Sequence, residues 1–348
     1  MPRITVYPLS FNSHVRQVLV GFMRLAATGA IDLRFATDAY RRYGVRPRHF
    51  LDDARLCAVA EIEGRRLVFD MHDTPDIFDP LLAIADLYFK RSYSRALHGH
   101  DRKIRPYGLN YGVETDRPWP TGAWLALNFE PGRHRVREAW RALKLPPWSH
   151  YEVADLAGEP RPSKEPRAIF LTRLWDPDDR EDRPDERRED RRQISQMRVA
   201  CVEALRSRFG DRVTGGLQPN SYARRHWPSL VADPALCRRD RFLAQLDHHD
   251  VCIATDGLYG SVGWKFAEYV AKARAIVTEP LRFELIGPIA PQTHYLEFED
   301  PRQCVESVEA LFDDEALRAS MMRANAEYFQ QYGLPERLIS HALAAELQ

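Results

Sequence analysis

The stretch from Asp250 to Glu279 constrains the fold more than any other part of the sequence. It contains an apolar run over 251–255, a loop with three glycines, a segment with helical spacing and a second apolar run over 275–278. Short apolar runs bounded by turn residues are typical of buried strands in a parallel sheet. The stretch therefore predicts a strand–helix–strand unit with a glycine-containing turn before the helix.

This turn and the start of the helix contain residues that are suited to binding a phosphate group. Gly263 precedes the predicted helix, and the exposed N–H groups and dipole of a helix N-terminus favour anions. Lys265 and Glu268 are three residues apart, so they share one helix face and can point at the same ligand. The alternative is an ordinary βαβ unit in which Lys265 and Glu268 form a surface salt bridge, because a glycine-rich turn alone is a weak signal.

Together with the segments that follow it, this pattern resembles the donor-nucleotide half of GT-B glycosyltransferases, in the group-1 and CgeB-like branch. The matching segments are 294–301, 304–312 and 321–332. The resemblance covers roughly Ala168 to Tyr332 and is only architectural before that. It implies an α/β fold with two Rossmann-like domains facing a central cleft, and a C-terminal helix that crosses back to the N-terminal domain.

The length of the chain and its Pro- and Gly-containing breaks agree with two domains, since 348 residues are more than a single hydrophobic core usually contains. We expect an acceptor-binding domain over 1–160, a donor domain over 167–332 and a final helix over 333–348. The Pro- and Gly-containing segment 158–166 is the predicted linker. Within the first domain the sequence predicts a hairpin over 56–69, a weaker strand over 125–129 and a helix over 133–145.

The resemblance assigns donor-binding roles to residues at the predicted strand ends. It places Arg173 and Lys265 at the diphosphate, although the family's usual Arg-then-Lys spacing is absent here. Glu268 matches the acid that binds the ribose hydroxyls, as a carboxylate can accept two hydrogen bonds from a diol. Asp256 and Glu279 either contact the sugar or cap turns, and Gly263 offers its backbone. Trp264 either stacks on the ligand or packs the helix on the sheet.

Candidate catalytic residues lie in the first half of the chain. An inverting enzyme needs a general base beside the acceptor hydroxyl. His14 follows the first predicted strand, and His72 follows a later one, with Asp73 placed to orient its ring. Each histidine can equally be a surface or capping residue. The group-1 likeness instead implies retention of configuration, which requires no protein nucleophile.

The function that follows is transfer of a sugar from a nucleotide-diphosphate sugar to an unknown acceptor hydroxyl, by a retaining and metal-independent reaction without a cofactor. The alternatives are a GT-B-shaped sugar-nucleotide epimerase or phosphorylase, and a catalytically silent nucleotide-sugar-binding protein. The acceptor is a polysaccharide, an envelope component, a natural product or a protein. Specificity lies in loop shapes that one sequence does not reveal.

The composition of the chain excludes several other classes of protein. Formal net charge is zero and the pI is about 7.2, so no overall field favours nucleic acid. The sequence has no transmembrane segment or signal peptide, so a cytoplasmic protein is expected. The five cysteines are scattered, which argues against a zinc site. Lysine occurs six times against 44 arginines, and Lys90 and Lys265 stand near predicted strand ends, whereas Lys272 is expected on the surface.

Overall fold

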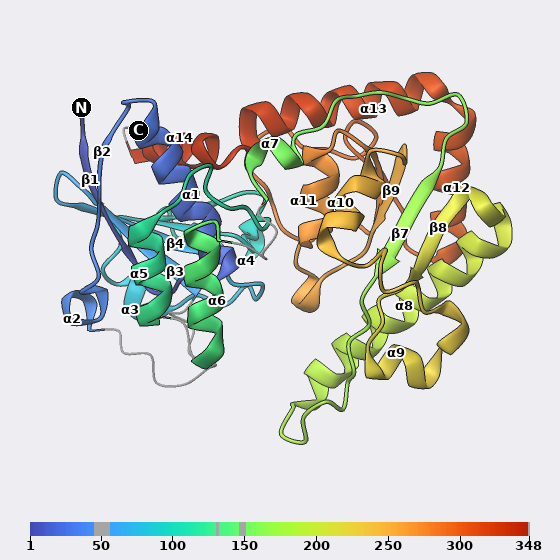
Figure 1. Cartoon of the computed structure of the whole chain (residues 1–348), viewed down its shortest axis with the longest axis horizontal. Coiled ribbons are helices and arrows are strands. Elements are labelled where there is room, and N and C mark those ends of the chain that lie inside the picture. Colours follow the sequence, from blue (N-terminus) through green and yellow to red (C-terminus); the bar gives the residue numbers. More distant parts are fainter. Residues whose placement is uncertain (45–55, 130–131, 146–150, 347–348) are drawn as a thin grey trace. The chain divides into compact units, whose positions relative to one another are not determined.

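The described part of the chain forms two compact units. The computed structural model describes residues 1–44, 56–129, 132–145 and 151–346. The first unit comprises Met1–Asp155, Phe283–Gly287 and the C-terminal segment from Gln330, and the second comprises Leu156–Arg282 and Pro288–Phe329. Each unit has its own sheet with helices packed against it (Figure 1). The chain is thus an α/β protein with two Rossmann-like units, and this part of the prediction is confirmed.

The sheet of the first unit has six strands in the order β2-β1-β3-β4-β5-β6. Only β3 runs against its neighbours; β1 is parallel to β2, and β4, β5 and β6 are parallel to one another. The predicted hairpin is confirmed as β3 and β4, whose turn residues Glu63 and Gly64 both have positive φ (50° and 85°). The strands are β1 (Arg3–Pro8), β2 (Asp32–Phe35), β3 (Cys57–Ile62), β4 (Arg65–Asp70), β5 (Leu87–Lys90) and β6 (Ile104–Pro106).

Both faces of this sheet are buried, and alternate residues of each strand face opposite sides. In β3 and β4, Ala58, Ala60 and Phe69 face a core shared with helices α1, α5, α6 and α14. Val59 and Val68 face a smaller core on the other side. The helices of the unit are α1 (Ser13–Ala27), α2 (Ala39–Tyr43), α3 (Asp79–Leu82), α4 (Arg95–His98), α5 (Pro120–Phe129), α6 (Gly132–Ala142) and α14 (Pro335–Glu346), with α7 (Val153–Leu156) at the unit boundary.

Helix α14, at the far end of the chain, packs on α1, near its beginning. The two helices meet at Gly21. A Cβ atom added there would lie 2.4 Å from the carbonyl oxygen of Pro335 and 2.6 Å from Cγ1 of Ile339. Only a glycine allows this approach of the two backbones.

The predicted strand over 125–129 is wrong, because these residues belong to α5. Leu125 and Ala126 are adjacent and both buried, as are Gly122 and Ala123 one turn earlier. This burial pattern fits one face of a helix, whereas a strand would bury alternate residues. A mostly apolar segment of five residues does not distinguish the two structures by periodicity.

The sheet of the second unit is entirely parallel, in the order β11-β10-β9-β7-β8. The first strand, β7, has its successor β8 on one side and β9 on the other, which is a doubly wound arrangement. The strands are β7 (Ala168–Thr172), β8 (Val213–Leu217), β9 (Val251–Ala254), β10 (Ala275–Thr278) and β11 (Leu296–Glu297). The helices are α8 (Asp185–Phe209), α9 (Ser221–His226), α10 (Arg239–Leu246), α11 (Trp264–Ala271), α12 (Pro301–Asp313) and α13 (Glu315–Tyr328).

The segment 157–167, between α7 and β7, contains no helix or strand. It is nevertheless fixed to the second unit. The backbone N–H of Gly158 donates to the carbonyl of Ala271, and both the N–H and the hydroxyl of Ser163 donate to the carboxylate of Asp250. None of the described helices is long and apolar enough to cross a membrane.

Candidate functional site

The strand order of the second unit changes direction at β7. The chain leaves β7 toward β8 on one side, whereas β9 lies on the other side, so the loops after β7 and β9 diverge. In open α/β sheets, ligands bind where the order of strands reverses, beyond the carboxyl ends of the strands. Arg173, Asp256 and Glu279 follow β7, β9 and β10 closely, so the topology brings these three predicted residues to the same edge.

Two arginines lie where β7 and β9 end. Arg173 is exposed, and its guanidinium lies 4.3 Å from the ring centroid of Trp175. Arg198, from α8, is buried beneath it and donates to the carbonyl of Arg173 (2.5 Å), to Oγ1 of Thr255 (2.9 Å) and to the carbonyl of Asp256 (2.7 Å). Burial lowers the pKa of Arg198 to about 10, so it remains a cation at neutral pH. It ties the two strand ends together and adds positive charge below Arg173.

Two carboxylates lie on the neighbouring side of this edge. Oε2 of Glu279 accepts a hydrogen bond from the backbone N–H of Asp256 (2.8 Å). Asp256 itself is nearly buried and contacts Nε of Arg282 at 2.8 Å. Burial and then the charge of Glu279 raise the pKa of Asp256 to about 6. A carboxyl group that titrates near neutrality at a strand end is a mark of functional sites.

The loop between β9 and α11 is strained at one residue. Tyr259 has φ 65° and ψ 22°, a left-handed conformation that is unusual for a bulky side chain. Helix α8 holds it there: Oδ2 of Asp190 accepts from its backbone N–H (3.2 Å), and the Arg187 guanidinium lies 3.9 Å from its ring centroid. Both residues come from the highly charged segment 176–192, which is helical from Asp185.

The start of α11 is open to a ligand. A Cβ atom added at Gly263 would meet nothing within 4 Å, and no side chain caps this helix start. A small pocket lies here, lined among others by Thr255, Asp256, Ser261, Gly263, Phe266 and Thr278. The helix N-terminus therefore offers its dipole to a space bordered by the ends of β9 and β10.

Further along α11, the structure gives Lys265 and Glu268 other partners than the sequence predicts. Nζ of Lys265 lies 3.3 Å from the ring centroid of Phe242 in α10, and burial lowers its pKa to about 8. Glu268 is 4% exposed and pairs with Arg239 at 2.8 Å. Trp264 lies with its ring 5.8 Å from the same guanidinium. These side chains attach α11 to α10, and the Lys265–Glu268 surface pair, which is the alternative interpretation of the sequence, is replaced by the Arg239–Glu268 pair.

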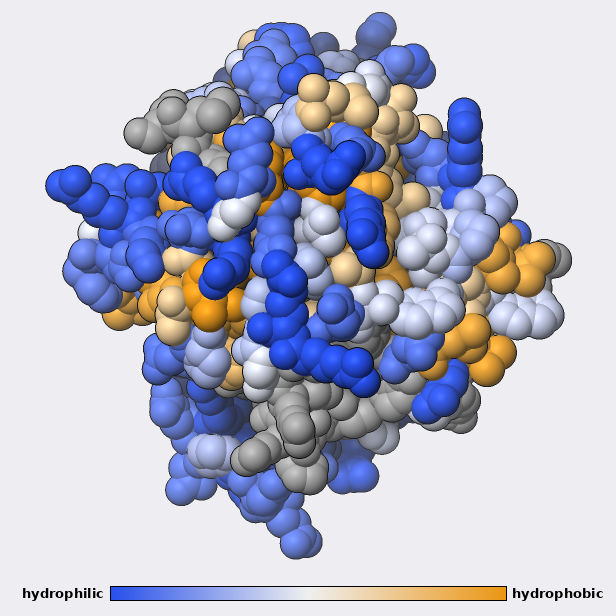
Figure 2. Space-filling model, turned by 90° about the vertical axis from the view of Figure 1, so that its left-hand side faces the viewer, coloured by the Kyte–Doolittle hydropathy of each residue, from blue (hydrophilic) through white to orange (hydrophobic). Residues whose placement is uncertain are grey.

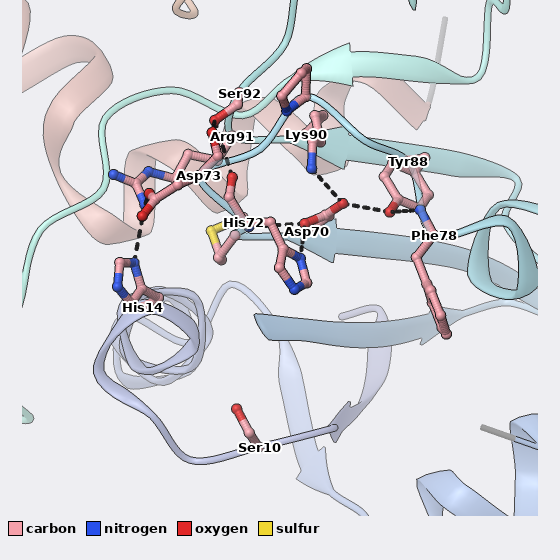
Figure 3. A network of polar contacts seen from close by, with 12 residues as sticks. Ser10, His14, Asp70, His72, Asp73, Phe78, Tyr88, Lys90, Arg91 and Ser92 are labelled. Atoms are coloured by element: carbon pink, nitrogen blue, oxygen red, sulfur yellow. Dashed lines mark hydrogen bonds and ion pairs between the residues drawn. The ribbon is translucent and has the colours of Figure 1, made fainter. Parts of the chain in front are cut away.

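The first unit has its own polar cluster, at the carboxyl ends of β4, β5 and β6 (Figure 3). Nδ1 of His14, at the start of α1, lies 3.0 Å from Oδ1 of Asn110 and 3.1 Å from Nη1 of Arg91. Arg91 also forms an ion pair with Asp73. Burial and then the charge of Arg91 lower the pKa of His14 to about 4, so this imidazole is neutral at physiological pH.

The second histidine of the cluster is oriented by a carboxylate inside the strand. Nδ1 of His72 lies 2.6 Å from Oδ1 of Asp70, whose other oxygen accepts from Lys90 (2.8 Å) and Tyr88 (2.6 Å) (Figure 3). If Nδ1 carries the proton, Nε2 is the basic nitrogen. The ring is thus oriented by Asp70 and not, as expected, by Asp73. Residues 70 and 72 lie on the same side of an extended chain, whereas adjacent residues point apart.

Asp70 is the most strongly perturbed acid of this cluster. Burial opposes its ionisation, but the Lys90 ammonium and the His72 ring together hold its pKa well below the usual range. The described residues include one group with metal-ligand geometry, Cys57, Asp70 and His72, whose ligand atoms lie within 4.8 Å of one another. A cation there would have to compete with the Lys90 ammonium for Asp70, so these residues fit an internal ion pair better than a metal.

No family model matches the sequence, and no curated protein matches it. Similar solved structures include the C-terminal domain of a glycosyl transferase group 1 family protein from Francisella tularensis (10% identity, 51% of this chain and 95% of that chain, TM-score 0.35). A sucrose-phosphate synthase from Thermosynechococcus elongatus (13%, 99% and 73%, 0.41) and an S. aureus MnaA–UDP co-structure (10%, 100% and 98%, 0.41) are also similar. All three similarities are distant. None of them assigns an activity to this chain.

Several residues of the strand-end site in the second unit and of the polar cluster in the first are not predicted from the sequence. Arg198 carries a signal that is easily overlooked, since 194, 198, 201 and 205 share one helical face and a lone arginine interrupts this otherwise apolar stripe. Asp70 and Arg91 carry no such signal, because their roles depend on pairing between strands. Arg282 lies far along the chain from Asp256, its ion-pair partner.

Proposed function

We propose that this protein is a GT-B glycosyltransferase whose second unit binds a nucleoside-diphosphate sugar at the carboxyl ends of β7, β9 and β10. One observation carries the proposal: the open start of α11 at Gly263 lies at the strand-end edge where exposed Arg173 and buried Arg198 supply positive charge. The sequence pattern over 168–332 favours the group-1 and CgeB-like branch.

The chemistry that these residues can support is stabilisation of the leaving diphosphate. Breaking the bond between a sugar and a diphosphate builds negative charge on the phosphate oxygens. In the proposal the guanidinium of Arg173 and the N–H groups at the start of α11 bind that charge, without a metal ion. Asp256 and Glu279 accept hydrogen bonds from sugar hydroxyls. Lys265 and Glu268 then serve mainly to hold α11 on α10, unless a ligand exchanges their partners.

The acceptor is proposed to bind at the polar cluster of the first unit. Two imidazoles there have distinct environments: His14 is neutral beside Arg91, and His72 faces Asp70 through Nδ1. Either can accept a proton from a hydroxyl in an inverting reaction. In a retaining reaction they instead position the acceptor. The anomeric configuration of the product, read by proton NMR, distinguishes the two.

The decisive test is titration calorimetry with UDP-, GDP- and dTDP-sugars. We expect one nucleotide class to bind the wild type, and Gly263→Val to weaken its binding at least tenfold, because the new side chain occupies the approach to the helix start. Gly263 has φ −69° and free space around it, so the midpoint of unfolding should barely change. Arg173→Ala should also weaken binding, whereas Arg161→Ala, at an exposed position of the same unit, should not. Folded wild type that binds none of these sugars would refute the proposal.

A further inference from the structure

Apolar side chains reach the surface of the molecule in several separate groups among hydrophilic ones (Figure 2). One group lies in a single pair of helices, α5 and α6. Seven large apolar residues of the described chain are exposed, and four of them lie in α5 and α6: Trp124 (44% exposed), Leu127 (46%), Val136 (51%) and Trp140 (44%). The antiparallel pair of α5 and α6 is called the α5–α6 hairpin below.

These four residues occupy the outer side of the hairpin. Residues 124 and 127 are three apart in α5, and 136 and 140 are four apart in α6, so each pair forms a short stripe on its helix. The inner faces carry the small and buried residues, including Ala123, Leu125 and Ala139, which belong to the core of the first unit. The core is therefore complete without the outer apolar residues, and their exposure to water is a cost that folding does not explain.

The hairpin is also strongly cationic in a chain whose formal net charge is zero. Helix α5 contains no ionisable residue, and 132–145 contains four arginines and one lysine against a single glutamate. That glutamate, Glu138, is buried and pairs with Arg137 and Arg141 as well as with buried Arg16, and Lys144 pairs with Glu152. Arg135 is exposed, next to Val136. The outer surface of the hairpin thus combines tryptophan, aliphatic residues and the exposed guanidinium of Arg135, within a segment whose basic residues outnumber its acidic ones.

We propose that the α5–α6 hairpin is a docking surface for an anionic lipid bilayer. Tryptophan and leucine beside arginine are the residues that insert at the level of lipid head groups, where rings and aliphatic side chains leave water while guanidinium groups meet phosphates. A second copy of the chain is a poorer occupant, because a symmetric contact would bring two surfaces of the same positive sign together. The proposal does not depend on the activity of the protein.

The test is vesicle flotation with the full-length protein. Vesicles of equal parts phosphatidylglycerol and phosphatidylcholine are compared with vesicles of pure phosphatidylcholine. We expect partitioning to the anionic vesicles to be at least tenfold stronger and to weaken steeply with added salt, because salt screens the attraction. Tryptophan fluorescence should shift to shorter wavelength only with the anionic vesicles, and brominated lipids should quench it.

Two variants and two matched controls locate the surface. Arg135→Glu should weaken partitioning by about fivefold or more, since each charge near an anionic surface changes affinity about fivefold. Leu127→Ser/Val136→Ser should weaken it by a similar factor. The controls are Leu97→Ser, at another exposed apolar position of the same unit (54% exposed), and Arg161→Glu, at an exposed position of the second unit; both should partition as the wild type does.

Three outcomes would overturn the proposal. The first is equal or absent partitioning of the folded wild type with the two kinds of vesicle. The second is the same loss in the controls as in the hairpin variants. The third is a dimer in sedimentation that dissociates in Leu127→Ser/Val136→Ser, which would make a second copy the occupant.

Discussion

The ammonium group of Lys90 lies 2.8 Å from Oδ2 of Asp70, and both side chains are almost completely inaccessible to solvent (0% and 1% exposed). The pair joins the ends of two neighbouring parallel strands, β4 and β5. Because the same carboxylate orients the ring of His72, the pair links the stability of the first unit to the chemistry proposed there.

Asp70→Asn should therefore lower the free energy of unfolding by roughly 3–5 kcal/mol, because it leaves a buried ammonium without a counter-charge. Urea unfolding measures this. Asp70→Asn/Lys90→Met should regain part of the loss, since the double variant buries no charge. Asp32→Asn, which breaks the exposed pair with Arg3, should cost less than about 1 kcal/mol. Equal losses for the Asp32 and Asp70 variants would contradict the assignment.

The raised pKa of Asp256 should make the free energy of unfolding depend on pH. Its pKa is raised from 3.8 to about 6 in the folded protein, so the folded state binds the proton more tightly than the unfolded state does. This contribution is fully present below pH 3.8 and is lost as pH rises through about 6. Relative to Asp256→Asn, the wild type should lose roughly 2–3 kcal/mol between about pH 4 and 7.5. Parallel urea-unfolding profiles of the two proteins would contradict it.

The lowered pKa of His14 should make the free energy of unfolding depend on pH in the opposite direction. Its pKa is lowered from 6.5 to about 4, so protonation opposes folding. The stabilising contribution is present above pH 6.5 and is lost as pH falls through about 4. Compared with His14→Gln, the wild type should lose roughly 3 kcal/mol between about pH 7.5 and 4. The NMR titration of the His14 ring provides a direct check, and a midpoint near its ordinary value would exclude the buried arrangement beside Arg91.

The close approach of α1 and α14 makes Gly21→Ala destabilising. An alanine in a helix interior normally stabilises by up to about 1 kcal/mol over glycine. Here its Cβ would collide with the carbonyl oxygen of Pro335, so we expect a net loss of roughly 1–3 kcal/mol in urea unfolding. Gly263→Ala is the matched control, because its Cβ meets open space and stability should be unchanged. A Gly21→Ala protein as stable as the wild type would disprove the contact.

The sequence predicts most of the strands because a short apolar run bounded by turn residues is long enough for a buried strand but short for a helix. The βαβ unit over 250–279 and the hairpin over 56–69 are examples, and both are present. The prediction fails at 125–129, where an apolar run too short to show a period belongs to a helix. Residues at strand ends can be predicted in the same way. His14, His72 and Asp73 are such residues, and they lie in one cluster.

The partners of charged residues could not be predicted, since they depend on which elements pack together. The rarity of lysine draws attention to Lys90, and its side chain is fully buried. The sequence also places Lys272 on the surface, yet this residue is 6% exposed and pairs with Asp247. Glu268 and Lys265 share one helix face as expected, but α10 supplies Arg239 and Phe242 as their partners. Sequence spacing defines the face of a helix and not what packs against it.

The return of α14 to α1 dictates an order of events during synthesis. Residues 1–155 emerge from the ribosome first, yet the groove around Gly21 stays unfilled until residues 335–346 have been made. All of the second unit is translated in that interval. The first unit therefore cannot complete its packing until the second unit has been translated, and a chain released early by a stalled ribosome or premature stop codon would expose the apolar surface that α14 covers.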